Sequence, residues 1–177
     1  TGRRVDVAVQ ACQACAYAHA HGVVHRDLKP ENIWVGEFGE VIVLDWGVSK
    51  VWGVTDPVVD GLGTPVLDAD LDQELSPLTR VGQRPGTPLY MSPEQVLGKH
   101  SIDERSDVFS MGVVLYEMLT GTPPAGRFEA IREVRKDISK ALAGAVDRAL
   151  SSIPNRRFED MGAFIDALGS GGGPSFS

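Results

Sequence analysis

Cysteine is scarce in this sequence, whose 177 residues contain only Cys12 and Cys15. The two stand three positions apart, and a lone pair at that spacing is at most half of a metal or redox site. Neither a second pair nor a histidine with the spacing of a metal ligand accompanies them. We therefore expect buried or half-buried thiols in a reducing compartment rather than a metal or redox centre.

Long apolar runs and an excess of positive charge are also missing. No stretch approaches the roughly 20 apolar residues of a membrane-spanning helix, so no membrane segment is predicted in this chain. The first residues, Thr1-Gly2-Arg3-Arg4, lack the apolar stretch of a signal peptide and suggest a piece of a longer protein. A formal net charge of −7 at pH 7 argues against a surface for nucleic acid or anionic membranes. We expect a cytoplasmic protein, and whether a longer parent chain is tethered to a membrane stays open.

What the sequence does have is the composition of an ordinary globular domain. Hydrophobic residues make up 42% and charged residues 23%, close to globular averages. Some stretches repeat apolar residues at helical spacing, and shorter runs are rich in Val and Ile. These patterns predict helices over 5–20, 107–119, 128–136, 138–150 and 158–168, and strands over 23–24, 33–35 and 41–44. The predicted fold class is mainly α with short β-hairpins, and the 107–119 helix, apolar nearly all round, is expected at its centre.

A long stretch without helical or alternating periodicity separates the two halves. It runs from Gly47 to about Pro88, is dominated by Gly, Pro, Asp and Thr, and carries much of the excess negative charge. A loop of this length inside a compact domain is normally functional or disordered. A second irregular stretch, the glycine-rich residues 169–177, is expected to form a flexible tail.

The strongest functional signal is the string His25-Arg26-Asp27-Leu28-Lys29-Pro30-Glu31-Asn32, followed beyond the hairpin by Asp45-Trp46-Gly47. Hard oxygen ligands such as those of Asn32 and Asp45 suit Mg²⁺ that bridges phosphate oxygens. A carboxylate such as Asp27 suits the acceptance of a hydroxyl proton, and the ammonium group of Lys29 suits a transferring phosphoryl group. For any one of these residues a simple turn would explain the residue type equally well, but not for the whole string in this order.

In this order the motifs resemble those of eukaryotic-type protein kinases. Residues 25–32 are similar to the catalytic loop, and residues 45–47 to the metal-binding Asp-Phe-Gly motif, with Trp in place of Phe. Residues 86–94 resemble the end of the activation segment, with Ser-Pro-Glu in place of Ala-Pro-Glu, and residues 106–112 the start of the central helix of the large lobe. The resemblance implies a bacterial-type serine/threonine kinase with the fold of the large C-terminal lobe.

The resemblance also implies a domain organisation. Residues 1–168 would form the C-terminal lobe, with the catalytic loop at 25–32 and the activation segment at 45–94, before the tail at 169–177. No glycine-rich loop or strand lysine occurs in this sequence. We therefore expect the small β-rich lobe to be absent from this chain, to be one of its partners, and the chain alone to be weak or inactive. The alternative is a non-catalytic kinase-like lobe that serves as an interaction module, or a truncated remnant.

The resemblance assigns catalytic and nucleotide-binding roles. Asp27 would accept or orient the substrate hydroxyl proton, and Lys29 would steady the γ-phosphate of ATP. Asn32 and Asp45 would hold Mg²⁺ beside the nucleotide. Trp34 would lie under the adenine, although an aromatic residue at the interface between the lobes is the alternative. The substrate would be a protein, since residues 86–94 correspond to a peptide-docking segment, and Lys29 with Thr87 fits serine or threonine acceptors.

Other residues would have structural roles. His25 and Trp46 would stack in a hydrophobic column beneath the motif that Gly47 completes. Asp107 would fix the backbone of the catalytic loop from beneath, and this role is compatible with capping the N-terminus of its own helix. Glu94 and Arg157 would form a buried ion pair at the end of the activation segment.

Arg26, beside Asp27, is the residue that the family links to control by phosphorylation. A phosphate in the activation segment would neutralise this guanidinium and order the segment. The candidate acceptors are Thr55, Thr64, Ser76 and Thr79, and Thr79 is preferred because it is nearest to the ordered end of the segment.

Overall fold

The computed structural model describes residues 1–46, 50–51, 58–59, 65–66, 89–98, 102–124 and 129–169. Several predicted sites lie outside these ranges: Gly47, Thr87 and the candidate phosphate acceptors Thr55, Thr64, Ser76 and Thr79. The tail beyond residue 169 lies outside them too.

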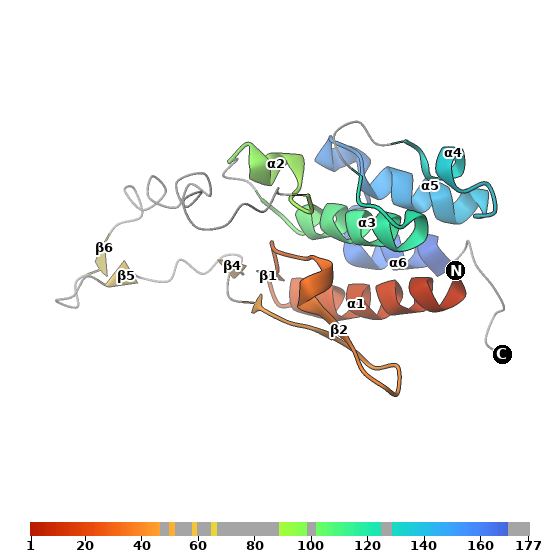
Figure 1. The fold of residues 1–177 in the computed structure, drawn as a ribbon. Coiled ribbons are helices and arrows are strands. Elements are labelled where there is room, and N and C mark those ends of the chain that lie inside the picture. Colours follow the sequence, from red (N-terminus) through yellow and green to blue (C-terminus); the bar gives the residue numbers. More distant parts are fainter. Residues whose placement is uncertain are drawn as a thin grey trace.

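Helices make up most of the described chain, which confirms the predicted fold class. The long ones are α1 (Gly2–Ala20), α3 (Arg105–Thr120), α5 (Lys140–Ala149) and α6 (Met161–Gly169). Figure 1 shows α3 between α1 and α6 on one side and α5 on the other. Single turns complete the set: η1 (Pro30–Asn32), α2 (Pro93–Val96), α4 (Ile131–Val134) and η5 (Pro154–Arg156).

Helix α3 lies in the centre of the fold, where 11 of its 16 residues are buried and the others are half-buried. Its glycine at position 112 permits close packing on α5, since a Cβ atom there would lie 3.0 Å from Ala149 Cβ. Gly121 ends the helix with φ of 91°, a left-handed conformation that glycine adopts without steric cost. The buried helix thus gives rigid support to the loops of the site.

Helix α1 packs a face of small residues against α3 and α6. Ala8, Ala11, Cys12 and Cys15 are buried on this face. Both cysteines are free thiols, as predicted. Burial raises the pKa of Cys12 to about 12, and burial together with the charges of Asp107 and Cys12 raises the pKa of Cys15. The thiols therefore fill the core and have little nucleophilic character.

The strands are short and pair antiparallel. Strands β2 (Ile33–Val35) and β3 (Val41–Val43) form the predicted hairpin, with Ile33 opposite Val43 and Trp34 opposite Ile42. The hairpin projects from the helical body in Figure 1. Strand β1 (Val23–Val24) pairs with β4 (Lys50–Val51), and β5 (Val58–Val59) pairs with β6 (Pro65–Val66). The stretch expected to lack regular structure thus contains three strands of two residues each.

Some helix boundaries differ from the predicted ones. The charged helix expected over 128–136 is a single turn, Ile131–Val134. It ends where Arg135 turns into an extended conformation and donates hydrogen bonds to Leu119 O and to the carboxylate of Asp137. Gly169 belongs to α6 and not to the tail. None of the helices in the described ranges combines the length and apolar character needed to cross a membrane.

Candidate active site

Hydrogen bonds to one buried carboxylate hold the loop after β1 against α3. Asp107 accepts hydrogen bonds from the backbone N–H groups of His25, at 2.8 Å to Oδ2, and Arg26, at 2.9 Å to Oδ1. The side chain of Asp107 is fully buried. The N-cap residue of α3 is Glu104, so Asp107 does not cap its own helix. Its carboxylate instead fixes the backbone of the loop that begins at His25.

A third group reaches the same carboxylate and was not predicted from the sequence. His19, on the last turn of α1, lies with Nε2 at 2.8 Å from Asp107 Oδ2. Its side chain is only 8% exposed. The only signal in the sequence was a histidine on a mostly apolar helix, which does not identify a contact 88 positions away. The pair joins α1 to α3 directly beneath the loop.

His25 is fully buried, and its neighbours determine which ring nitrogen carries a proton. Nε2 lies 2.9 Å from the carbonyl oxygen of Leu44, which accepts only, so Nε2 carries the hydrogen. The backbone N–H of Asp27 donates to Nδ1 at 3.2 Å, so Nδ1 offers a lone pair. The ring of Trp46 packs against His25 with centroids 4.6 Å apart. The imidazole is therefore a neutral link between the loop and the end of β3.

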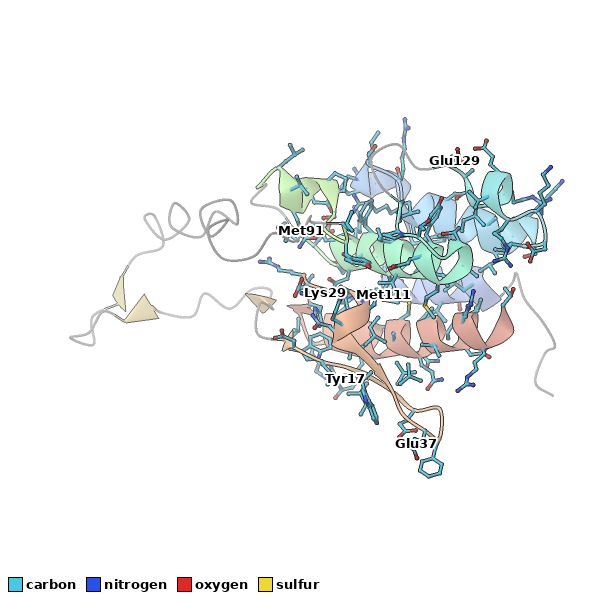
Figure 2. The ribbon with its side chains drawn as sticks, viewed as in Figure 1. Tyr17, Lys29, Glu37, Met91, Met111 and Glu129 are labelled. Atoms are coloured by element: carbon cyan, nitrogen blue, oxygen red, sulfur yellow. The ribbon has the colours of Figure 1, made fainter. Side chains whose placement is uncertain are left out.

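Asp27 is the centre of the polar cluster. Lys29 Nζ donates to its Oδ2 at 2.6 Å, and Asn32 Nδ2 donates to its backbone oxygen at 2.8 Å and to Oδ2 at 3.3 Å. The side chains of Asp27 and Lys29 are 27% and 34% exposed. Both contacts with other side chains fall on Oδ2, and no described residue donates a hydrogen bond to Oδ1, which can therefore accept one from an incoming hydroxyl group. In Figure 2, Lys29 lies at the end of the lobe at which Met91 also lies, and Glu129 lies at the opposite end.

Asn32 and Asp45 have the donor types that Mg²⁺ prefers. Asn32 directs Nδ2 toward Asp27, which leaves the amide oxygen Oδ1 as a hard ligand. The backbone N–H of Leu44 donates to Asn32 O at 2.8 Å, so the residue before Asp45 is bonded to Asn32. Asp45 is exposed and has a left-handed φ of 59°. No cluster of three or more His, Cys, Asp or Glu side chains that could hold a metal occurs in the described ranges. The donor types of these two residues suit an ion whose remaining ligands come from phosphate oxygens and water.

Arg26 combines a strained backbone with an incompletely satisfied side chain. Its φ is 69°, in the left-handed region that non-glycine residues seldom adopt. Its Nε atom is buried and has no hydrogen-bond acceptor among the described residues. Burial lowers the pKa of the guanidinium, and the charge of Asp107 opposes this effect. Among the described residues, Asp107 thus supplies the charge that opposes this effect, and one buried N–H of Arg26 has no acceptor.

Glu94 and Arg157 form a two-pronged buried ion pair. Arg157 donates from its two terminal nitrogens to Oε1 and Oε2 of Glu94, at 2.6 and 2.7 Å. Ser106 Oγ donates to Glu94 Oε1 at 2.8 Å. Burial alone would raise the pKa of Glu94, but the hydrogen bonds from Arg157, the backbone and Ser106, with the charge of Arg157, lower it to about 2. This pair attaches α2 to the segment that precedes α6.

Trp34 lies on the exposed face of the β2–β3 hairpin. It is 49% exposed, and it stands opposite Ile42, which is 47% exposed. Leu44, 44% exposed, continues this apolar surface toward Asp45. Trp34 is therefore a surface residue of the described chain and not a core aromatic.

Comparison with known proteins places this geometry in a family. The protein kinase domain family matches residues 3–168. The chain belongs to the protein kinase family. It is 41% identical over 137 residues to the serine/threonine-protein kinase PknD of Protochlamydia amoebophila (strain UWE25), over 76% of this chain and 13% of that protein. It is 36% identical over 185 residues to the serine/threonine-protein kinase Pkn1 of Myxococcus xanthus, over 94% of this chain and 24% of that protein.

These matches confirm the resemblance to bacterial serine/threonine kinases. The chain spans between 13% and 24% of the length of these two curated relatives. Among solved structures, the kinase domain of PknI from Mycobacterium tuberculosis superposes with a TM-score of 0.66 at 22% identity, over 96% of this chain and 54% of that one. The structural likeness shows the fold, which confirms the prediction of a kinase-like lobe.

Proposed function

We propose that this chain is the catalytic-loop lobe of a serine/threonine protein kinase, which transfers the γ-phosphate of ATP to hydroxyl groups of proteins. The observation that carries the proposal is the cluster in which Lys29 and Asn32 both donate to Asp27 Oδ2, while no described residue donates to Asp27 Oδ1. The anchoring of the loop to Asp107 supports it, because phosphoryl transfer depends on positioning and charge compensation more than on covalent chemistry.

Each residue of the cluster has a distinct part in this proposal. Asp27 orients the acceptor hydroxyl group and takes its proton at Oδ1. Lys29, already 2.6 Å from Asp27 Oδ2, places a positive charge beside the transferred group. Asn32 Oδ1 and the carboxylate of Asp45 are the ligands for Mg²⁺, which when bound compensates the negative charge of the phosphates. His25 and Trp46 keep the loop and the metal-binding residues in register.

The proposal assigns residues 1–168 to the large lobe, with the activation segment at 45–94. It also holds that groups binding the adenine and the α- and β-phosphates come from a small lobe that residues 1–177 do not include. The exposed apolar surface of Trp34, Ile42 and Leu44 supports this part, because a contiguous apolar surface is typical of an interaction site. The chain alone is then a weak enzyme, since half of the nucleotide site positions ATP poorly.

Incubation of the complete natural polypeptide with Mg²⁺-ATP and a peptide library tests the function. The library contains matched peptides that differ only in a Ser, Thr or Tyr acceptor. We expect phosphate on serine and threonine, none on tyrosine, and a much slower reaction with residues 1–177 alone. A folded protein that phosphorylates no acceptor would contradict the proposal and favour the non-catalytic interaction module.

We also propose that a phosphate on the segment 45–94 completes the surroundings of Arg26, with Thr79 as the preferred acceptor. The buried Nε atom of Arg26 without an acceptor in the described ranges supports this role. Mass spectrometry after incubation with ATP should find phosphate on Thr79 or on Thr55, Thr64 or Ser76, and phosphatase treatment should lower the activity. A fully active protein without phosphate in this segment would rule the proposal out.

A further inference from the structure

Gln95, on the short helix α2, contacts the catalytic loop although it is 69 positions away in the sequence. Its Nε2 donates to the backbone oxygen of Arg26 at 2.7 Å. Its Oε1 accepts from the backbone N–H and from the hydroxyl of Ser92, both at 3.0 Å. The residue is buried. Both the oxygen and the nitrogen of this amide group thus have a fixed partner.

The orientation of the Gln95 amide follows from its partners. A backbone N–H only donates and a backbone carbonyl only accepts. The atom that faces the N–H of Ser92 must therefore be oxygen, and the atom that faces the carbonyl of Arg26 must be nitrogen. The reversed orientation would place two acceptors together and two donors together.

The bond acts at the strained point of the loop. Arg26 has φ of 69°, and such a conformation persists only where the surroundings fix it. Asp107 on α3 holds the N–H of Arg26, and Gln95 on α2 holds its carbonyl oxygen. The peptide group on the carbonyl side carries the N–H of Asp27, which donates to His25 Nδ1. The two peptide groups that flank Arg26 are thus fixed from two different helices.

Helix α2 is itself fixed in place next to this contact. Glu94, the residue before Gln95, is held by Arg157 and Ser106 through buried hydrogen bonds. A displacement of α2 would therefore change the position of the Gln95 amide relative to the loop. The side chain of Gln95 thus connects the end of the segment 45–94 to the peptide group that precedes Asp27.

We propose that Gln95 is a positioning residue, which couples the placement of α2 to the orientation of Asp27 through the carbonyl group of Arg26. The proposal rests on the proposed kinase function for its catalytic consequence. Its structural part, the fixing of the peptide group between Arg26 and Asp27, is testable without any activity.

Gln95→Glu is the sharpest variant. The carboxylate keeps the size of the side chain and still accepts from Ser92, as in a capping box, but it has no N–H for Arg26 O. Gln95→Met, which has neither donor nor strong acceptor, serves as the second variant if the carboxylate impairs folding. Gln13→Glu is the matched control, because it makes the same amide-to-carboxylate change at an exposed residue of α1.

Two measurements on the complete natural polypeptide decide the proposal. Amide hydrogen exchange at Asp27, followed by NMR, should be faster in Gln95→Glu and Gln95→Met and unchanged in Gln13→Glu. The kcat for peptide phosphorylation should fall about 10-fold to 100-fold, with the KM for ATP changed much less.

Unchanged exchange at Asp27 in both Gln95 variants would overturn the proposal. Faster exchange at Asp27 in the Gln95 variants, together with a kcat equal to that of the parent, would overturn the coupling of α2 to the orientation of Asp27. If the parent protein phosphorylates nothing but exchange at Asp27 is still faster in the Gln95 variants, the contact is supported and only the kinase function is contradicted.

Discussion

Replacing Asp27 by asparagine should abolish most of the phosphoryl transfer while the protein stays folded. The amide keeps the shape of the carboxylate but cannot take a proton from the acceptor hydroxyl group. It also removes the charge that Lys29 Nζ contacts at 2.6 Å. A positioned general base contributes about 10²-fold to 10⁴-fold to a rate, and we expect a loss of kcat in that range.

Glu37→Gln is the matched control for this prediction. It makes the same carboxylate-to-amide change at an exposed residue in the turn of the β2–β3 hairpin, far from Lys29 in Figure 2. Single-turnover transfer from Mg²⁺-ATP and thermal unfolding should be measured for both variants. Parental kcat in a folded Asp27→Asn protein would mean that another group accepts the proton, and the assignment of the site would be wrong.

Replacing Arg157 by methionine should cost about 3–5 kcal/mol of unfolding free energy, because it leaves a carboxylate buried without its counter-charge. Arg157 is 2% exposed and Glu94 is 4% exposed, so water cannot replace the lost donors. The guanidinium also donates to the backbone oxygens of Arg105 and Ser151. The change thus releases α2, the start of α3 and the turn after α5 together.

Urea unfolding of three variants separates the effect of the buried, unpaired carboxylate from the effect of losing an arginine side chain. Arg156→Met, the same change at an exposed neighbour, should be close to the parent. The double variant Glu94→Gln with Arg157→Met should recover part of the loss, because no charge is then buried. A loss below about 1 kcal/mol in Arg157→Met, the value of an exposed pair, would contradict the prediction.

The pH dependence of stability gives an independent check on the ion pair. The folded-state pKa of Glu94 is lowered to about 2 from an ordinary value of 4.5. A lowered pKa stabilises the fold above the ordinary value, and this stability is lost as the pH falls from 4.5 toward 2. The parent should lose stability over that window, and Arg157→Met should lose less there.

Local sequence patterns predicted the elements whose partners are near in sequence or whose burial is complete. The apolar run of α3 and its terminating Gly121 located the central helix, and the β2–β3 hairpin followed from its two strands and turn. Helix α4 is shorter than predicted because Arg135 bonds with Leu119 O and Asp137 instead of continuing the helix. Strand β4 was missed because Lys50–Val51 lacks the run of Val and Ile that predicted β1, β2 and β3.

The site itself was predictable only through its motif. Asp27, Lys29 and Asn32 are close in sequence, so their contacts follow from one loop. The links of His19 to Asp107 and of Gln95 to Arg26 join residues far apart in the sequence, and nothing in the spacing of either residue identifies its partner. The pattern Ser92-x-x-Gln95 predicts a capping box, but the second half of that amide bonds a loop that only the tertiary fold brings near.

The burial of Cys12 and Cys15 has a practical consequence for spectroscopy. Because neither sulfur is accessible in the folded protein, a single cysteine introduced at Phe38, which is 96% exposed in the hairpin turn, would be the one site open to a maleimide dye or a nitroxide spin label. The mobility or fluorescence of such a probe would report on the hairpin as nucleotide is added, with no need to remove these two sulfhydryls first.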